Sequence, residues 1–465
     1  MTAPRPNADF VHGNILPLLL RFAGPVLLAL TLQATYGAVD VWVVGQFAAT
    51  EDVSAVATGS QILFTATVLI TGLSMGATVL LAQHLGSRSA ATARNQPEPD
   101  VWSGQIVGAA ISLFGLLALG LTLGLILAAA PLARLLQAPA SAFAATVTYV
   151  RICACGGVCI VGYNLLGSIF RGLGDSRTPL LAVAIACVGN VGGDLLLVKG
   201  CHMGAAGAAL ATAVSQGVSL LCCLLVIRRR GLPFPLTRRQ IRFHREALRR
   251  ILRLGLPAAA QDGLVSISFM ALIAIVNSLG LVASAGVGVA EKLCNFIMLV
   301  PSAAMQALSA FVGQNVGAGR PDRAKTAMLW GMAVSFGFSL VLAWLSYFHG
   351  DWLARIFDQD PAVVAAAWQY LQAYAIDTLL TAFLFCFLGY FNGWGRTGFV
   401  LIQGLTGSFL IRIPISYLMS RMAEPSLFLV GLGTPISSLI QILLCLLYLA
   451  ILERRQKRAA LAVSS

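Results

Sequence analysis

Five carboxylates stand in otherwise apolar stretches of this chain: Asp40, Asp194, Asp262, Glu291 and Asp377. On insertion scales, a carboxylate at the centre of a bilayer costs about 2.5–3.5 kcal/mol. Residues of this kind therefore tend to face a polar interior and to mark the path of an ion or a proton. Each of the five is a candidate for function.

The densest group of polar residues lies in the first half of the chain. In "ACVGNVGGDLLLV" (186–198), Asn190 and Asp194 are four residues apart and share one face of a helix. Four more polar residues lie in neighbouring apolar stretches, namely Asp40, Tyr149, Asn164 and Thr212. Carboxylate, amide and hydroxyl oxygens are ligands that suit Na⁺. Two nearby carboxylates also suit proton carriage, because each disfavours the charge on the other. The alternative is that these side chains only hydrogen-bond helices to one another.

The composition decides which elements must position these residues. Of the 465 residues, 58% are apolar and only 11% are charged, whereas about a quarter of an ordinary globular chain is charged. Apolar runs of about 20 residues or more fit the hydrocarbon core of a bilayer as helices. We count twelve spans, near 17–47, 52–82, 102–132, 142–168, 178–198, 204–227, 251–280, 284–316, 326–347, 361–391, 397–420 and 427–452. The sequence therefore predicts an all-α, multi-pass membrane protein.

Lysine and arginine predict the orientation, because cytoplasmic loops carry the excess of positive charge. With the N-terminus inside, the inner segments from Arg5 to Arg458, Arg94 among them, hold 23 of the 31 basic residues. Both termini are then cytoplasmic, in a cell inner membrane. The net charge of +13 comes largely from "RRRGLPFPLTRRQIRFHREALRR" (228–250). This segment lacks the interleaved aromatic residues of a nucleic-acid groove, and we expect a linker on anionic lipid and no nucleic-acid partner.

The basic segment also separates two similar halves. "RFAGP" (21–25) matches "RLGLP" (253–257), "AQHLGSRSAATAR" (82–94) matches "GQNVGAGRPDRAK" (313–325), and "FRGLGDSRTP" (170–179) matches "FNGWGRTGFV" (391–400). Six spans per repeat is an even number, so both repeats enter the membrane from the same side. We predict an N-lobe (1–227), a cytoplasmic linker (228–250) and a C-lobe (251–465), as two six-helix bundles related by a pseudo-two-fold axis along the membrane normal. Transporters often use this design and bind substrate between the halves.

Other chemistry is excluded by what the sequence lacks. It has no Walker A sequence, no catalytic Ser/His/Asp pattern and no His-Glu-x-x-His. We therefore expect no enzyme activity and no cofactor, with transport driven by an ion gradient. The cysteines fall mostly inside apolar spans, where a thiol behaves as a small hydrophobe.

The whole layout resembles the multidrug and toxic compound extrusion (MATE) family of the prokaryotic type. The segments that carry the resemblance are "GPVLLALTLQATYGAVDVWVVGQF", "GLSMGATVLLAQHLGS", "NLLGSIFRGLGDSRTPLLAVAIACVGNVGGDLLLV", "GAAGAALATAVSQ" and "FVGQNVGAGRPDRA", in this order along nearly the entire chain. The resemblance implies a twelve-helix exporter with a cation-coupling site in the N-lobe. On this sequence that site, which could take Na⁺ or a proton, falls on Asp40, Asn190, Asp194 and Thr212, with Tyr149 and Asn164 in the supporting network.

The C-lobe departs from the family pattern. Some members carry a glutamate eight residues after the proline of span seven, and here that position is Val265. Asp262 and Asp377 are the candidates for a second polar site.

The sequence thus favours a monomeric antiporter that exports organic, cationic and amphipathic compounds in exchange for H⁺ or Na⁺, by alternating access between the lobes. Two alternatives stay open. A flippase for lipid-linked sugars would need basic residues in its cavity, and Arg412 is the main basic residue within a span. A membrane scaffold or receptor that transports nothing would tolerate neutralisation of the buried aspartates.

Overall fold

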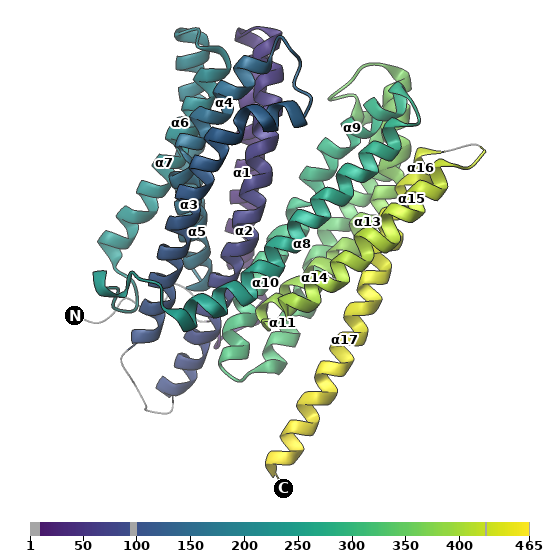
Figure 1. Cartoon of the computed structure of the whole chain (residues 1–465). Coiled ribbons are helices and arrows are strands. Elements are labelled where there is room, and N and C mark those ends of the chain that lie inside the picture. Colours follow the sequence, from purple (N-terminus) through teal and green to yellow (C-terminus); the bar gives the residue numbers. More distant parts are fainter. Residues whose placement is uncertain (1–9, 94–99, 424–425, 465) are drawn as a thin grey trace. The chain divides into compact units, whose positions relative to one another are not determined.

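A computed structural model describes residues 10–93, 100–423 and 426–464, and every regular element in these ranges is a helix (Figure 1). Arg5 and Arg94, which contribute to the predicted orientation, lie outside the described residues. Within these ranges, eleven helices are long and apolar enough to cross a membrane, and a bent pair, if it forms one span, brings the number to twelve. The predicted all-α, multi-pass fold is therefore confirmed.

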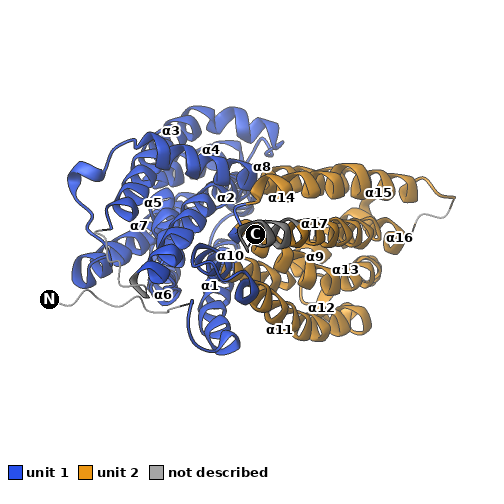
Figure 2. Ribbon diagram, turned by 90° about the horizontal axis from the view of Figure 1, so that it is seen from below, with its two compact units in different colours: residues 1–260, 309–324, 393–395 blue, residues 261–308, 325–392, 396–465 orange. Residues whose placement is uncertain are grey.

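The described residues form two compact units, which Figure 2 shows in different colours. The first comprises residues 1–260, 309–324 and 393–395, and the second comprises 261–308, 325–392 and 396–465. The predicted N-lobe (1–227) falls within the first unit, which also takes in the basic segment and short pieces of the second repeat. The lobe boundaries themselves stay a prediction.

The helices of the first unit are α1 Ile15–Phe47, α2 Thr50–Ala93, α3 Val101–Leu135, α4 Phe143–Cys155, α5 Gly157–Gly172, α6 Arg177–Asp194, the π-helix η1 Leu195–Gly200, α7 Gly204–Arg230 and the 3₁₀ turn η2 Arg238–Gln240. Helix α6 packs between α1 and α7, and α2 packs against α4 and α5. Helices α4 and α5 meet at a bend of 51°. The bend lies at Gly156, where a Cβ would be only 2.9 Å from the Cβ of Ala213 on α7. A glycine at this position allows the close approach of α7.

Four helices contribute to both units: α8 Arg245–Asn277, α10 Leu299–Gly317, α11 Pro321–Phe348 and α13 Pro361–Gly393. The others of the second unit are α9 Leu281–Ile297, α12 Gly350–Ala354, α14 Thr397–Leu405, the π-helix η3 Thr406–Arg412, α15 Ile413–Ser420, α16 Leu427–Gly431 and α17 Gly433–Ser464. The start of α11, up to Ala324, belongs to the first unit. Each unit has its own core of buried apolar side chains.

Large apolar side chains on the outside of the helices fit a lipid environment. On α3, Leu116, Leu119, Leu123 and Leu127 are each more than half exposed and recur at three- and four-residue intervals. They form a stripe along one helix face. In water such a stripe would be costly, whereas in a bilayer it faces acyl chains.

The basic segment between α7 and α8 packs against α3. Gly104 and Gly108 on α3 lie so close to Pro235 and Gln240 that a Cβ at either would contact them, and Phe234 is buried. The predicted linker is therefore held on the first unit over at least part of its length.

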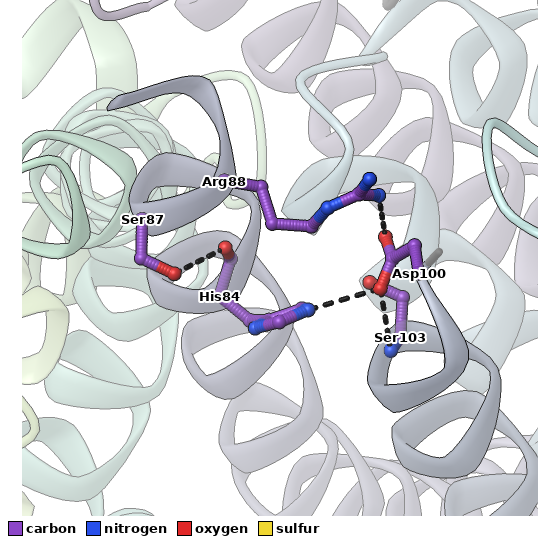
Figure 3. A network of polar contacts seen from close by, with 5 residues as sticks. All are labelled: His84, Ser87, Arg88, Asp100 and Ser103. Atoms are coloured by element: carbon purple, nitrogen blue, oxygen red, sulfur yellow. Dashed lines mark hydrogen bonds and ion pairs between the residues drawn. The ribbon is translucent and has the colours of Figure 1, made fainter. Parts of the chain in front are cut away.

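An ion-pair cluster joins the end of α2 to the start of α3 (Figure 3). The buried Asp100 caps α3 by accepting from the backbone N–H of Ser103, and its carboxylate lies 3.0 Å from His84 Nε2 and 2.5 Å from Arg88 Nη1. Burial by itself raises the pKa of the Asp100 carboxyl, but the hydrogen bonds from His84, Ser103 and Arg88 outweigh it and hold that pKa well below its usual range.

Candidate functional site

The structure brings all four predicted coupling residues together inside the first unit. Asp40 on α1 accepts a hydrogen bond from Thr212 Oγ1 on α7 at 3.0 Å, and Asn190 Nδ2 on α6 lies 3.4 Å from the same hydroxyl. Asp194 lies one turn after Asn190 and beside Asp40, so the two carboxyl groups interact. Helices far apart in the sequence thus converge on one polar point.

This cluster is almost completely shielded. Asn190 and Asp194 are 0% exposed, and Asp40 is 4% exposed. Four of its oxygens have no hydrogen-bond donor among the described residues: Asp40 Oδ1, Asn190 Oδ1 and both carboxylate oxygens of Asp194. Leaving such oxygens buried and unpaired is costly. A proton shared by the carboxyl groups, or a cation among the oxygens, would satisfy them.

The backbone at Asp194 is irregular. This residue ends α6, and the chain continues without a turn into η1. Single π-helical turns are rare and occur often at functional sites. Sequence periodicity does not reveal this change.

The two supporting residues differ in their placement. The buried Tyr149 lies close enough to Asp40 and Asp194 for electrostatic interaction with both carboxyl groups. Asn164 instead accepts from Thr71 Oγ1 at 3.2 Å and donates to the carbonyl of Ile160 in its own helix at 2.8 Å. These two hydrogen bonds join α5 to α2 and hold α5 internally, and neither reaches the aspartates.

The candidates for a C-lobe site lie in the second unit and are not joined by any described contact. Asp377 is buried on α13, where its Oδ1 accepts from Ser438 Oγ at 2.6 Å and its charge interacts with that of Arg412. Asp262, on α8, is only half-buried. Arg412 itself donates to Ser268 Oγ at 3.0 Å and lies 4.3 Å from the centre of the Phe269 ring. Asp377 thus has a hydrogen-bond donor in Ser438, whereas neither oxygen of Asp194 has one among the described residues.

Sequence reasoning missed one pair beside the N-lobe cluster. Gln216 Nε2 donates to Tyr36 Oη at 3.0 Å. Tyr36 precedes Asp40 by one turn of α1, and Gln216 follows Thr212 by one turn of α7. The four-residue spacing to each predicted residue was the signal that could have found them.

The donor set limits what can bind here. Among the described residues, no three or more His, Cys, Asp and Glu side chains gather as they would around a transition metal. Two carboxylates, an amide oxygen and a hydroxyl instead suit a hard monovalent cation or a proton.

Comparisons with known proteins agree with this architecture. The profile of the MatE family matches residues 25–196 and 257–418, which is more than half of the chain. The probable multidrug resistance protein YpnP of Bacillus subtilis is 31% identical over 430 residues, covering 91% of this chain and 93% of that protein. The probable multidrug resistance protein NorM of Idiomarina loihiensis is 25% identical and covers 86% of each chain.

Solved structures show the same fold. The outward-facing conformation of a multidrug resistance MATE family transporter superposes with a TM-score of 0.87 at 20% identity, covering 98% of this chain and 100% of that one. A transporter of the MOP superfamily from Pyrococcus furiosus gives a TM-score of 0.86 at 21% identity, over 94% and 96% of the two chains. These relatives are transporters and not enzymes. The chain therefore belongs to the MATE family of multidrug efflux transporters.

Proposed function

We propose that this transporter is an antiporter that exports organic, cationic and amphipathic compounds in exchange for H⁺ or Na⁺. The observation that carries the proposal is the set of four buried oxygens around Asp40, Asn190 and Asp194 that no described donor satisfies. Burying these oxygens without a donor destabilises the fold, and a bound cation or proton would offset this cost.

The cluster couples ion and substrate because its contacts span three helices. A proton or Na⁺ at the carboxylates draws α1, α6 and α7 together through Asp40, Asp194 and Thr212. Without the ion, repulsion between the carboxylates favours a different packing of α1. If the compound binds the second packing better, ion and compound each weaken the binding of the other by the same factor. Alternating access of the two lobes then turns this competition into export.

The substrate class follows from the charge of the site and its surroundings. Two acidic groups in an apolar protein favour a positively charged compound with an apolar body. The apolar side chains of the first unit that we assign to substrate contact are Phe64 and Met75. The names of the relatives, multidrug resistance proteins, support a range of compounds rather than a single one.

We place the transporter as a monomer in a cell inner membrane with both termini in the cytoplasm. The distribution of lysine and arginine supports this orientation. The exposed apolar helix faces support direct contact with membrane lipids.

Efflux from proteoliposomes tests the proposal. The protein is reconstituted with a fluorescent lipophilic cation, and a proton gradient or a Na⁺ gradient is imposed. We expect one gradient to drive export, and Asp40→Asn and Asp194→Asn each to abolish it while the protein still elutes as a folded species. Asp351→Asn is the matched control, because Asp351 lies in α12 and pairs with Arg355.

If neither gradient moves the dye, or both aspartate variants export normally, the antiporter proposal is wrong. Scrambling of a fluorescent lipid-linked pyrophosphate by the same vesicles would then identify a flippase.

A further inference from the structure

The first unit contains one short motif twice. Gln83-His84-Leu85-Gly86 lies near the end of α2, and Gln314-Asn315-Val316-Gly317 lies at the end of α10. The two copies occupy equivalent places in the two sequence repeats. Both glutamines, the carbonyl groups that they contact and the four motif residues of each copy belong to the first unit.

Each glutamine reaches a turn of the opposite repeat. Gln83 Nε2 donates to the carbonyl of Gly393, the last residue of α13, at 2.8 Å. Gln314 Nε2 donates to the carbonyl of Gly172, the last residue of α5, at 3.0 Å. The two hydrogen bonds are therefore a reciprocal pair.

The two accepting turns have the same geometry. Asp175 N–H donates to the Phe170 carbonyl and Arg396 N–H to the Phe391 carbonyl, both at 2.8 Å. The next glycine in each turn takes a left-handed conformation, with φ of 79° at Gly174 and 71° at Gly395. The last carbonyls of a helix lack partners within the helix. Each glutamine amide satisfies one of them.

The glycines of the motif bring the two backbones into contact. A Cβ at Gly86 would overlap the backbone carbonyl of Gln314, and a Cβ at Gly317 would overlap that of Gln83. Helices α2 and α10 thus cross at these two glycines. This close crossing is what lets each glutamine span to the opposite turn.

The residue after each glutamine anchors its own helix. His84 and, one turn later, Arg88 pair with Asp100 at the start of α3 (Figure 3). Asn315 donates to the carbonyl of Phe10, whose ring is buried between Phe22 and Phe311. The ends of α2 and α10 are therefore each held by their own contacts. Separation of these two ends from each other would break the hydrogen bonds of Gln83 and Gln314.

We propose that Gln83 and Gln314 are positioning residues for the transport cycle, forming a paired latch between the repeats at the helix ends we predict to be cytoplasmic. The inference rests on the proposed alternating access. The latch favours the state in which these ends are closed, and both bonds break when the ends separate to admit substrate. Because each repeat donates one of the two hydrogen bonds, the stability of the closed state depends on both repeats.

Hydrogen–deuterium exchange of the full-length protein in lipid nanodiscs tests the latch without substrate or gradient. We expect Gln83→Met and Gln314→Met each to speed exchange in the peptides that cover residues 170–178 and 391–399 and the end of α10. The expected increase is roughly two- to tenfold for each variant, and about the product in the double variant, since one hydrogen bond is lost in each. Gln83→Glu and Gln314→Glu keep the side-chain length but remove the donor, and should act in the same direction.

Gln403→Met is the matched control, because Gln403 is buried like Gln314 but donates to the Val400 carbonyl of its own helix at 3.0 Å. It should leave exchange in both turns unchanged. The proposal is overturned if the Gln83 and Gln314 variants leave exchange unchanged. It is also overturned if the control raises exchange as much, or if exchange rises throughout α3 and α4 with a matching loss of thermal stability, which would show a purely structural role. A failure of drug antiport would not alter this measurement, so the two proposals fail separately.

Discussion

Replacing Asp194 with asparagine should stabilise the protein when protons and Na⁺ are both scarce. Under these conditions both oxygens of the Asp194 carboxylate are buried without a donor, beside a second carboxylate. Asn keeps the shape, removes the charge and brings its own N–H₂ group as a donor to Asp40. The insertion cost of a charged aspartate, about 2.5–3.5 kcal/mol, sets the upper limit of the gain.

This gain corresponds to a higher melting temperature. For a unit of roughly this size, 1 kcal/mol shifts the midpoint by about 2–4 °C, so the limit is about 5–14 °C. Thermal unfolding in detergent at high pH without Na⁺ measures it. Lowering the pH or adding Na⁺ should then stabilise the unaltered protein by about 2.7 kcal/mol at an ion concentration a hundred times the dissociation constant. The Asp194→Asn variant should gain much less.

Asp377→Asn provides the contrast. Asp377 is as buried as Asp194, but it accepts from Ser438 and lies near Arg412. Its neutralisation removes the charge that interacts with Arg412 and should therefore destabilise the protein at high pH, where the carboxyl group is ionised. If Asp194→Asn destabilises just as Asp377→Asn does, and keeps the full response to pH and Na⁺, the reasoning about unpaired oxygens is wrong.

Substitutions at three further contacts are tested by thermal unfolding. Thr212→Val removes the donor to Asp40 and should cost about 1–3 kcal/mol without ions, whereas Thr212→Ser should restore most of it. The lowered pKa of Asp100 means that its ionised form stabilises the folded chain above the usual carboxyl range, and that this stabilisation is lost as the pH falls through the folded-state value. Asp100→Asn should thus lower the melting temperature at neutral pH, and the difference should shrink on acidification; a constant difference would contradict this. Gly86→Ala should destabilise by about 1–3 kcal/mol through overlap, whereas Gly120→Ala, with open space around it, should stabilise by about 0.5–1 kcal/mol.

The number of spans and the grouping of Asp40, Asn190, Asp194 and Thr212 could be predicted from the sequence. Long apolar runs leave few alternatives to helices, and buried charges are too costly to scatter at random. The repeat also indicated where equivalent turns would lie.

Other features depend on tertiary packing and could not be predicted. The bend at Gly156 depends on the approach of Ala213, and the π-helix after Asp194 leaves no mark on the hydrophobic pattern. By its residue type and its place in the sequence, Asn164 resembles a member of the cluster. In the structure its amide oxygen instead accepts a hydrogen bond from Thr71. The partners of Gln83 and Gln314 lie 310 and 142 residues away in the chain, beyond any local pattern.

The central claim is that ion and compound compete through the N-lobe carboxylates. The most direct test is to add a transported cation to the purified protein in weakly buffered detergent and to record the protons or Na⁺ released. We predict stoichiometric release from the unaltered protein, and none from a variant with both Asp40→Asn and Asp194→Asn. Equal release from both proteins would place the coupling elsewhere and contradict the account.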